Sequence, residues 1–294
     1  MKNYLILILL TLSFSCKNIK TETNEKTQKT SDSELLETFR YSFEVDPLVS
    51  VHRGGKGLKY YPENCLETLQ YVNDSILAIF EIDVAKTKDG VLVLMHDNTL
   101  ERTTTGTDKL EKYTYQELLA FNLVDDFGSE TTFKIPKFTD VLAWAKQNEA
   151  VLTVDIKRSV EVADVIKEIR GQQAEDVSII ITYDVEQAVR AYTLAPELLL
   201  SVSARNQKEL DRLLETNIPP GNMLAFTGTR LSDISLYETI HQLGIKTMLG
   251  TLGNLDKQAE VKGDTLYQAW RKMKIDIFAT DRPFQVAAAL NIVK

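Results

Sequence analysis

The chain has 294 residues, of which 44% are hydrophobic and 26% are charged, and its formal net charge is −8. The negative balance argues against a nucleic-acid partner, because that role requires a basic patch on the protein. The length suits a single α/β barrel of about 250 residues, so it does not require two domains. Only two cysteines occur, Cys16 and Cys65, so no disulfide framework is expected.

Residues 1–16 resemble the signal peptide of a bacterial lipoprotein. Lys2 precedes the apolar run 4–10, which Leu12 and Phe14 extend to nine apolar residues, and about nine apolar residues are too few to span a bilayer. Cys16 follows Ser15 where such proteins are acylated. The resemblance implies an exported protein that faces the periplasm or the cell surface and is anchored in the membrane through the lipid on Cys16. The alternative is an ordinary signal peptide with an incidental cysteine.

The segment after Cys16 is almost wholly polar from Lys17 to Thr30. A segment of this composition cannot bury enough apolar surface to fold by itself. We therefore expect a flexible tether over residues 17–46 and a folded domain over residues 47–294.

From Pro47 onward, short apolar runs rich in Val and Ile alternate with stretches of helical spacing, such as Val160–Arg170 and Val185–Leu194. This alternation predicts a parallel sheet covered by helices, and eight such strands predict closure into a (β/α)₈ TIM barrel. The eight runs are Leu48–His52, Ala78–Val84, Val151–Lys157, Val177–Tyr183, Leu198–Ala204, Met223–Gly228, Lys246–Gly250 and Ile275–Asp281.

A ninth apolar run, Val91–Met95, lies too close to the second strand for a parallel crossover. Lys88-Asp89-Gly90 favours a turn, so we expect a β-hairpin after strand two. A turn centred at Lys88 and Asp89 pairs residue 83 with 94 and residue 81 with 96. Residues 97–134 interrupt the alternation with Thr, Asp, Gly and aromatic residues, and they are expected to form a small insertion over the barrel mouth.

Two of the three histidines fall at strand ends on the same rim of the predicted barrel. His52 ends strand one, and His96 follows the hairpin strand. Because TIM-barrel active sites lie at the carboxyl ends of the strands, both are candidate acid–base residues. His241 falls in the helical stretch Leu236–Leu243 and is interpreted as an ordinary helix residue.

Three carboxylates converge on adjacent strands of the predicted barrel. Glu81 and Asp83 are two residues apart and share one face of a strand, and Asp155 and Lys157 repeat this spacing on the next barrel strand. Clustered oxygen ligands suit a hard divalent cation. The alternative is an ion-pair network in which Arg53 and Lys157 neutralise the acids.

An ordered set of motifs between residues 49 and 283 resembles the glycerophosphodiester phosphodiesterase family. The motifs are His52-Arg53-Gly54, Pro62-Glu63-Asn64, Glu81–Val84, Thr87–Gly90, His96-Asp97, Arg102–Thr104 with Gly106, Ile135-Pro136, Asp155–Lys157 and Ala279–Pro283. Any one of them is weak evidence, whereas their order and spacing are specific.

The resemblance implies a metal-dependent enzyme that hydrolyses small-molecule glycerophosphodiesters to glycerol phosphate and an alcohol. No obligate protein partner is evident from the sequence. His52 and His96 would act as general base and general acid, and Arg53 and Lys157 would hold the phosphate. Glu63 would orient His52 or a metal-bound water. One divalent ion, Ca²⁺ or Mg²⁺, would be held by Glu81, Asp83 and Asp155.

Two alternatives stay open. A metal-free phospholipase C of the same superfamily would carry a basic group where the metal would lie, and a silent lipoprotein would only bind glycerophosphate ligands. The sequence also departs from the family pattern at three places: Asp155 replaces the usual Glu, Cys65 replaces the usual Thr, and residues 250–254 differ. Head-group preference, the choice of metal and the attacking nucleophile, water or the glycerol hydroxyl, are not determined by the sequence.

Overall fold

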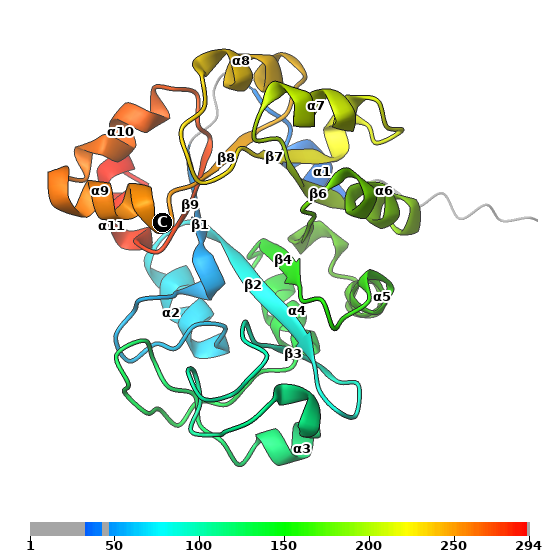
Figure 1. Cartoon of the computed structure of the whole chain (residues 1–294), viewed down its shortest axis with the longest axis vertical. Coiled ribbons are helices and arrows are strands. Elements are labelled where there is room, and N and C mark those ends of the chain that lie inside the picture. Colours follow the sequence, from blue (N-terminus) through cyan, green and yellow to red (C-terminus); the bar gives the residue numbers. More distant parts are fainter. Residues whose placement is uncertain (1–32, 43–46, 293–294) are drawn as a thin grey trace, which may run out of the picture. The chain divides into compact units, whose positions relative to one another are not determined.

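A computed structural model describes residues 33–42 and 47–292 of the chain. Within this range eight parallel strands close into a barrel, because β1 pairs with both β9 and β2 (Figure 1). The predicted (β/α)₈ fold is confirmed. The barrel strands are β1 (Leu48–Val51), β2 (Ala78–Lys86), β4 (Leu152–Ile156), β5 (Ser178–Ile181), β6 (Leu199–Ser203), β7 (Met223–Phe226), β8 (Thr247–Gly250) and β9 (Ile277–Thr280).

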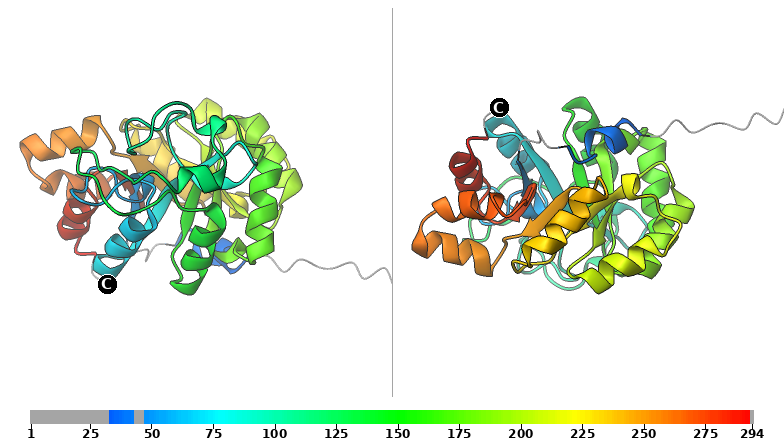
Figure 2. Two further views of the ribbon diagram at one scale, coloured as in Figure 1. Left: turned by 90° about the horizontal axis from the view of Figure 1, so that it is seen from below. Right: turned by 90° about the horizontal axis from the view of Figure 1, so that it is seen from above.

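Helices surround the barrel on its outer face (Figures 1 and 2). They follow the strands as predicted, and the side chains of Asp184 and Asn206 cap two of them. The helices are α2 (Leu66–Ser75), α4 (Phe138–Gln147), α5 (Val162–Gln172), α6 (Val185–Leu194), α7 (Gln207–Leu214), α8 (Ile234–Gln242), α9 (Asn254–Lys262), α10 (Thr265–Arg271) and α11 (Pro283–Leu290).

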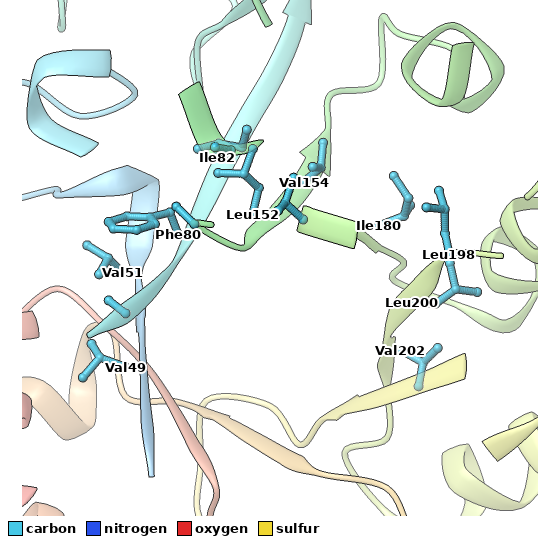
Figure 3. Close-up of a cluster of buried hydrophobic side chains, with 14 of the residues drawn as sticks. Val49, Val51, Phe80, Ile82, Leu152, Val154, Ile180, Leu198, Leu200 and Val202 are labelled. Carbon is cyan, nitrogen blue, oxygen red and sulfur yellow. The ribbon is translucent and has the colours of Figure 1, made fainter. Parts of the chain in front are cut away.

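The main hydrophobic core lies between the barrel and these helices, and it follows from the two-residue period of the strands (Figure 3). Val49 and Val51 of β1 belong to this outer core, whereas Ser50 lines the barrel interior. On β4, Leu152 and Val154 likewise alternate with interior residues. The same alternation therefore directs polar side chains into the barrel.

The expected β-hairpin is present, with β3 (Leu92–Leu94) antiparallel to the extended end of β2. Its register differs by one residue from the expected pairing, since Leu94 pairs with Val84 instead of Asp83. The cause is the turn: Gly90 adopts a left-handed conformation with φ of 84°. The loop therefore holds three residues instead of two, and Thr87 pairs with Val91.

The insertion 97–134 contains a 3₁₀ turn at Leu110–Lys112 and helix α3 (Tyr115–Leu118), and it has a small apolar core of its own. It flanks the barrel mouth beside β3 instead of extending across it (Figure 1). Within the described chain, none of its residues from 98 to 134 lines the central cavity. Asp125 and Asp126 accept hydrogen bonds from the backbone N–H groups of Tyr60 and Gly57, which attaches the insertion to the loop after β1.

The last part of the expected tether is structured, so that prediction is wrong for residues 33–42. Helix α1 (Glu34–Thr38) is capped by Ser33. Leu35, Leu36 and Phe39 are buried against interior residues of the barrel such as Ile79 and Ile179. These three side chains pack on apolar residues at the amino-terminal end of the barrel interior, here called the barrel floor. An argument from the polar composition of the segment does not detect this contact. The segment thereby closes the amino-terminal end of the barrel.

The signal peptide, the acylation site at Cys16 and the rest of the tether lie outside the described residues. In the described part of the chain, none of the helices combines the length and the hydrophobicity that crossing a bilayer requires.

Candidate active site

A cavity of about 230 Å³ occupies the barrel interior toward the carboxyl ends of the strands. Its lining includes five of the residues singled out from the sequence, namely His52, Glu81, Asp83, His96 and Asp155. The opposite wall is formed by Phe226, Met248 and Leu252 together with the hydroxyl groups of residues such as Ser201, Ser203 and Thr229. The cavity is therefore acidic on one side, whereas the other side combines apolar side chains with hydroxyl groups.

The three acids lie together because β2 and β4 are adjacent and in register, with Asp83 directly beside Asp155. One oxygen of each of Glu81, Asp83 and Asp155 lies within 4.8 Å of the others. The Lys157 ammonium group lies 2.5 Å from Asp83 Oδ1 and 2.8 Å from Asp155 Oδ2. Asn64 also donates a hydrogen bond to Asp83, at 2.7 Å.

The charges of this acid trio are only partly compensated. Burial raises the pKa of Glu81 well above its ordinary value, and the neighbouring charge of Asp83 raises it further. Burial would also raise the pKa of Asp83, but the charge and hydrogen bond of Lys157 hold it below its ordinary value. A cluster of oxygen ligands that a single lysine only partly neutralises fits a hard divalent cation.

The ion-pair alternative considered for the sequence is also visible in the structure. Lys157 bridges Asp83 and Asp155, and Arg53 Nε lies 4.0 Å from Asp83 Oδ2. In this arrangement, Lys157 lies among the acids and also lines a neighbouring cavity between the β4 and β5 loops. The same residues thus satisfy both descriptions.

His52 is held by a residue that the sequence reasoning did not assign. Its Nδ1 lies 2.6 Å from Asp281 Oδ1, and its Nε2 lies 4.0 Å from Glu81 Oε2. Burial would raise the pKa of Asp281, but the hydrogen bond to His52 and the charges of Lys56 and Arg53 lower it below its ordinary value. An ionised Asp281 requires the hydrogen on Nδ1, which leaves Nε2 without a hydrogen on the cavity side of the ring.

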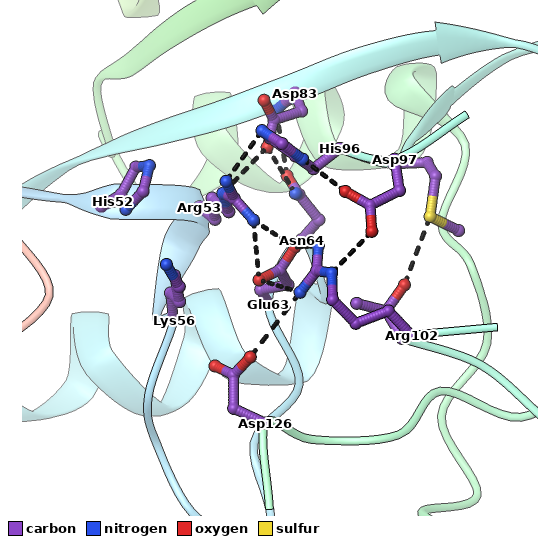
Figure 4. A network of polar contacts seen from close by, with 12 residues as sticks. His52, Arg53, Lys56, Glu63, Asn64, Asp83, His96, Asp97, Arg102 and Asp126 are labelled. Carbon is purple, nitrogen blue, oxygen red and sulfur yellow. Dashed lines mark hydrogen bonds and ion pairs between the residues drawn. The ribbon is translucent and has the colours of Figure 1, made fainter. Parts of the chain in front are cut away.

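His96 has the same arrangement. Its Nδ1 lies 2.6 Å from Asp97 Oδ1, and its Nε2 lies 2.7 Å from Arg53 Nη2 (Figure 4). A hydrogen bond from Arg102 holds the pKa of Asp97 well below its ordinary value. In both candidate histidines, Nδ1 therefore lies within hydrogen-bond distance of a carboxylate, and Nε2 is the ring nitrogen left for other contacts in the site.

Arg53 owes its position to a tight turn after β1. The backbone of Arg53 is left-handed, with φ of 50° and ψ of 34°, an uncommon conformation for a residue other than glycine. This turn directs the Arg53 N–H to Glu81 Oε2 at 2.7 Å and the guanidinium to Glu63 at 3.0 Å. Gly54 follows with φ of 67°, and a Cβ there would lie 2.6 Å from Leu69.

Glu63 contacts two arginines instead of His52, the first of its two expected partners. Its carboxylate accepts hydrogen bonds from Arg53 and from Arg102, and the side chain is 2% exposed. Orientation of His52, the first expected role of Glu63, is provided by Asp281. Glu63 therefore positions arginines.

The sequence reasoning quoted the motifs that contain Asp97, Arg102 and Asp281 but assigned them no role. For Asp281, a signal was available. Barrel closure pairs Val51 with Thr280, so the next residues, His52 and Asp281, are expected side by side. No comparable rule places Arg102, which lies in the irregular insertion.

The fold and the site define a (β/α)₈-barrel protein with two carboxylate-bound histidines and an acid trio around one cavity. Residues 52–266 match the Glycerophosphoryl diester phosphodiesterase family. Because this match covers more than half of the chain, the protein belongs to that family.

Related proteins agree with this assignment. The chain is 30% identical over 161 residues to a glycerophosphodiester phosphodiesterase of Bacillus altitudinis, covering 52% of this chain and 65% of that protein. It is 34% identical over 112 residues to glycerophosphodiester phosphodiesterase 1 of Homo sapiens, covering 36% and 32% of the two chains. The chain thus spans less than two thirds of the length of these curated relatives.

Solved structures show the same barrel. A glycerophosphoryl diester phosphodiesterase from Parabacteroides distasonis matches with a TM-score of 0.80 and 31% identity, covering 87% of this chain and 90% of that one. A phosphodiesterase from Oleispira antarctica, in complex with the product sn-glycerol-3-phosphate, matches with a TM-score of 0.68 and 20% identity, covering 87% and 99%. At that identity, the second match shows the shared fold.

Proposed function

We propose that this protein hydrolyses glycerophosphodiesters to glycerol phosphate and an alcohol. The observation that carries the proposal is the pair of carboxylate-bound histidines whose Nε2 atoms serve a cavity lined by three acids. Family membership and the 31% identical structure over 90% of its length support the same reaction. Cleavage of a phosphodiester needs charge neutralisation, deprotonation of a nucleophile and protonation of a leaving alkoxide.

Each requirement has a candidate residue. We propose that His52 Nε2 accepts the proton of the attacking hydroxyl or water, because Asp281 keeps the hydrogen on Nδ1 and leaves Nε2 free to accept one. We assign protonation of the leaving oxygen to His96. In the structure, Arg53 Nη2 donates to His96 Nε2, so the guanidinium must turn to the phosphate before that nitrogen can carry a proton. The phosphate thereby gains a cation and His96 becomes able to act as the acid.

We further propose that Glu81, Asp83 and Asp155 hold one divalent ion, either Ca²⁺ or Mg²⁺. When bound, such an ion supplies charge neutralisation for the phosphate and polarises its phosphorus–oxygen bonds. Lys157 would then be released from part of its pairing with the acids and would contribute to phosphate binding, as Arg53 does. A metal-free phospholipase C would carry a basic group where the metal would lie. Three clustered acids at this position therefore argue against that mechanism.

Turnover of a panel of glycerophosphodiesters, with and without chelator and with Ca²⁺ or Mg²⁺ restored, tests both parts of the proposal. Activity that resists chelation favours the metal-free alternative, and binding without turnover favours the silent lipoprotein. His52→Ala and His96→Ala should each lower kcat by about 10²–10⁴-fold. His241→Gln is the matched control, since His241 also pairs with an aspartate, Asp276 at 2.8 Å, but lies outside the cavity lining.

We also propose that the protein is exported and anchored in a membrane through lipid on Cys16. The proposal rests on the residues around Cys16. Cys16→Ser should release an active enzyme into the soluble fraction and remove the lipid mass detected on the intact protein. A wild-type protein that carries no lipid would contradict the anchor.

A further inference from the structure

Arg102 lies in the insertion, yet it contacts two carboxylates that hold candidate site residues, those of Glu63 and Asp97 (Figure 4). Its Nη1 and Nη2 donate to the two oxygens of Glu63, at 3.0 and 2.7 Å. Its Nε donates to Asp97 Oδ2 at 2.6 Å. One planar guanidinium therefore satisfies two separate carboxylates at the same time, a geometry that a lysine ammonium group cannot reproduce.

Each of these carboxylates holds a residue that we assign to the reaction. Glu63 accepts Arg53 Nη1 at 3.0 and 3.2 Å, and Asp97 accepts His96 Nδ1 at 2.6 Å. Arg53 and His96 are themselves in contact, at 2.7 Å. The five side chains thus form a closed ring that runs through Arg102, Glu63, Arg53, His96 and Asp97.

The two contacts of Arg102 have different physical effects. At Asp97, the hydrogen bond from Arg102 Nε to Oδ2 fixes the carboxylate with its Oδ1 toward the imidazole, which keeps the hydrogen on His96 Nδ1. At Glu63, it shares a deeply buried carboxylate with Arg53. Without Arg102, Arg53 becomes the nearest cation for both Glu63 oxygens and is drawn away from the cavity. A single substitution therefore disturbs the tautomer of His96 and the position of Arg53 together.

We propose that Arg102 is a positioning residue that sets the Nδ1–H tautomer of His96 and holds Arg53 ready for the phosphate. The catalytic part of this proposal rests on the proposed phosphodiesterase function. The attachment of the insertion does not rest on Arg102, because Asp125 and Asp126 accept hydrogen bonds from the backbone N–H groups of Tyr60 and Gly57 at 2.6 Å each, whereas Arg102 Nη1 makes only a longer contact with Asp126 Oδ1, at 3.7 Å. Loss of Arg102 should therefore leave the insertion in place.

The first experiment compares Arg102→Ala and Arg102→Lys with the control Arg170→Ala in the full-length protein. Arg170 is matched, because it also donates to a buried glutamate, Glu197, and is 45% exposed at the side chain against 39% for Arg102. Arg170 lies near the end of α5, outside the cavity lining. With glycerophosphocholine as substrate, Arg102→Ala should lower kcat about 10- to 100-fold, the usual cost of losing a residue behind the site.

The conservative variant and chemical rescue separate positioning from folding. Arg102→Lys should recover only part of kcat, since one ammonium group can serve Glu63 or Asp97 but not both. Added guanidinium ion at non-denaturing concentration should raise the activity of Arg102→Ala and leave Arg170→Ala unchanged. Equal melting temperatures of the two alanine variants would exclude a general loss of structure.

The second experiment does not depend on any substrate. The chain has three histidines, so nitrogen-15 spectra of the imidazoles contain three assignable ring systems. At a fixed pH of about 8, above the ordinary histidine pKa, His96 should show hydrogen on Nδ1 in the wild type and a mixture of tautomers in Arg102→Ala. His241 should be unchanged.

Two results would overturn the proposal. One is an Arg102→Ala protein in which His96 keeps its Nδ1–H tautomer. The other is loss of kcat that is no larger than in Arg170→Ala and is not rescued by guanidinium. If the wild type does not cleave glycerophosphodiesters, the proposed function fails, while the tautomer measurement still decides the positioning role.

Discussion

The contact between Asp281 and His52 leads to a prediction that the geometry makes quantitative. In Asp281→Asn, the side chain keeps its size but loses the negative charge 2.6 Å from Nδ1. The other oxygen, Oδ2, lies 3.9 Å from the Lys56 ammonium group. Because Lys56 repels an amide NH₂ and attracts a carbonyl oxygen, the asparagine should turn its NH₂ toward His52. That orientation requires the hydrogen on Nε2 and disables the base.

The size of the loss follows from two estimates. A hydrogen bond to a charged group contributes about 1.5–3 kcal/mol, which is about 10- to 150-fold in rate. An inverted tautomer costs more, about 10⁴-fold where an aspartate orients a catalytic histidine. Asp281 is only partly buried, with 25% of its side chain exposed, so water moderates the effect. We expect kcat/KM to fall by about 10²–10³-fold in Asp281→Asn.

The assay is the release of glycerol phosphate from glycerophosphocholine, measured as kcat/KM for the single and double variants. Lys56→Ala alone should have little effect, but combined with Asp281→Asn it should restore part of the activity, because the amide is then free to present its oxygen to Nδ1. Activity of Asp281→Asn within about threefold of wild type would refute an orienting role for Asp281. An absence of any recovery in the double variant would refute the amide-orientation argument.

Three further predictions concern the barrel floor, the acid trio and the acid stability of the site. Phe39→Ala removes a buried ring and should lower the free energy of unfolding in urea by about 3–5 kcal/mol without changing kcat; an unchanged midpoint would show that α1 is not packed. Asp155→Asn should sharply weaken Ca²⁺, Mg²⁺ and Mn²⁺ binding in calorimetry, whereas Asp155→Glu should keep activity; a wild-type affinity in the asparagine variant would remove Asp155 as a ligand. The pKa of Asp97 is lowered in the folded state, chiefly by Arg102, so its stabilising contribution is complete above the unfolded value of about 3.9 and declines below it. The difference in melting temperature between wild type and Arg102→Gln should therefore narrow as the pH falls below about 4, and a constant difference would contradict this linkage.

The acid trio and the barrel itself were predictable from the sequence, because both depend on short-range regularities. A two-residue period places Val49 and Val51 on one face and Ser50 on the other. The same period places Glu81 and Asp83 together, and neighbouring parallel strands in register bring Asp155 beside them. These relations require only strand identity and strand order, and both follow from the alternating pattern of the chain.

The hairpin and helix α1 show where local reasoning becomes insufficient. The hairpin was expected correctly, but its register depends on whether Gly90 adopts a positive φ and adds a residue to the turn. By composition, helix α1 resembles part of a polar linker. Its segment is stabilised only when Leu35, Leu36 and Phe39 pack on the apolar residues of the folded barrel. The packing of α1 is thus decided outside its own segment, whereas the hairpin register is decided by the backbone conformation of one turn residue.

The sequence by itself determined the fold class and the acid trio, since regular strands place these residues by spacing alone, and it located the two histidines just after the ends of strands. Only the tertiary structure decided which carboxylate holds each histidine and which arginines Glu63 binds. Asp281 lies 229 residues from His52, and Arg102 lies 39 residues from Glu63 in an irregular insertion. Contacts of this kind depend on ring closure and loop packing, in which many distant residues act together, so no local pattern in the chain specifies them.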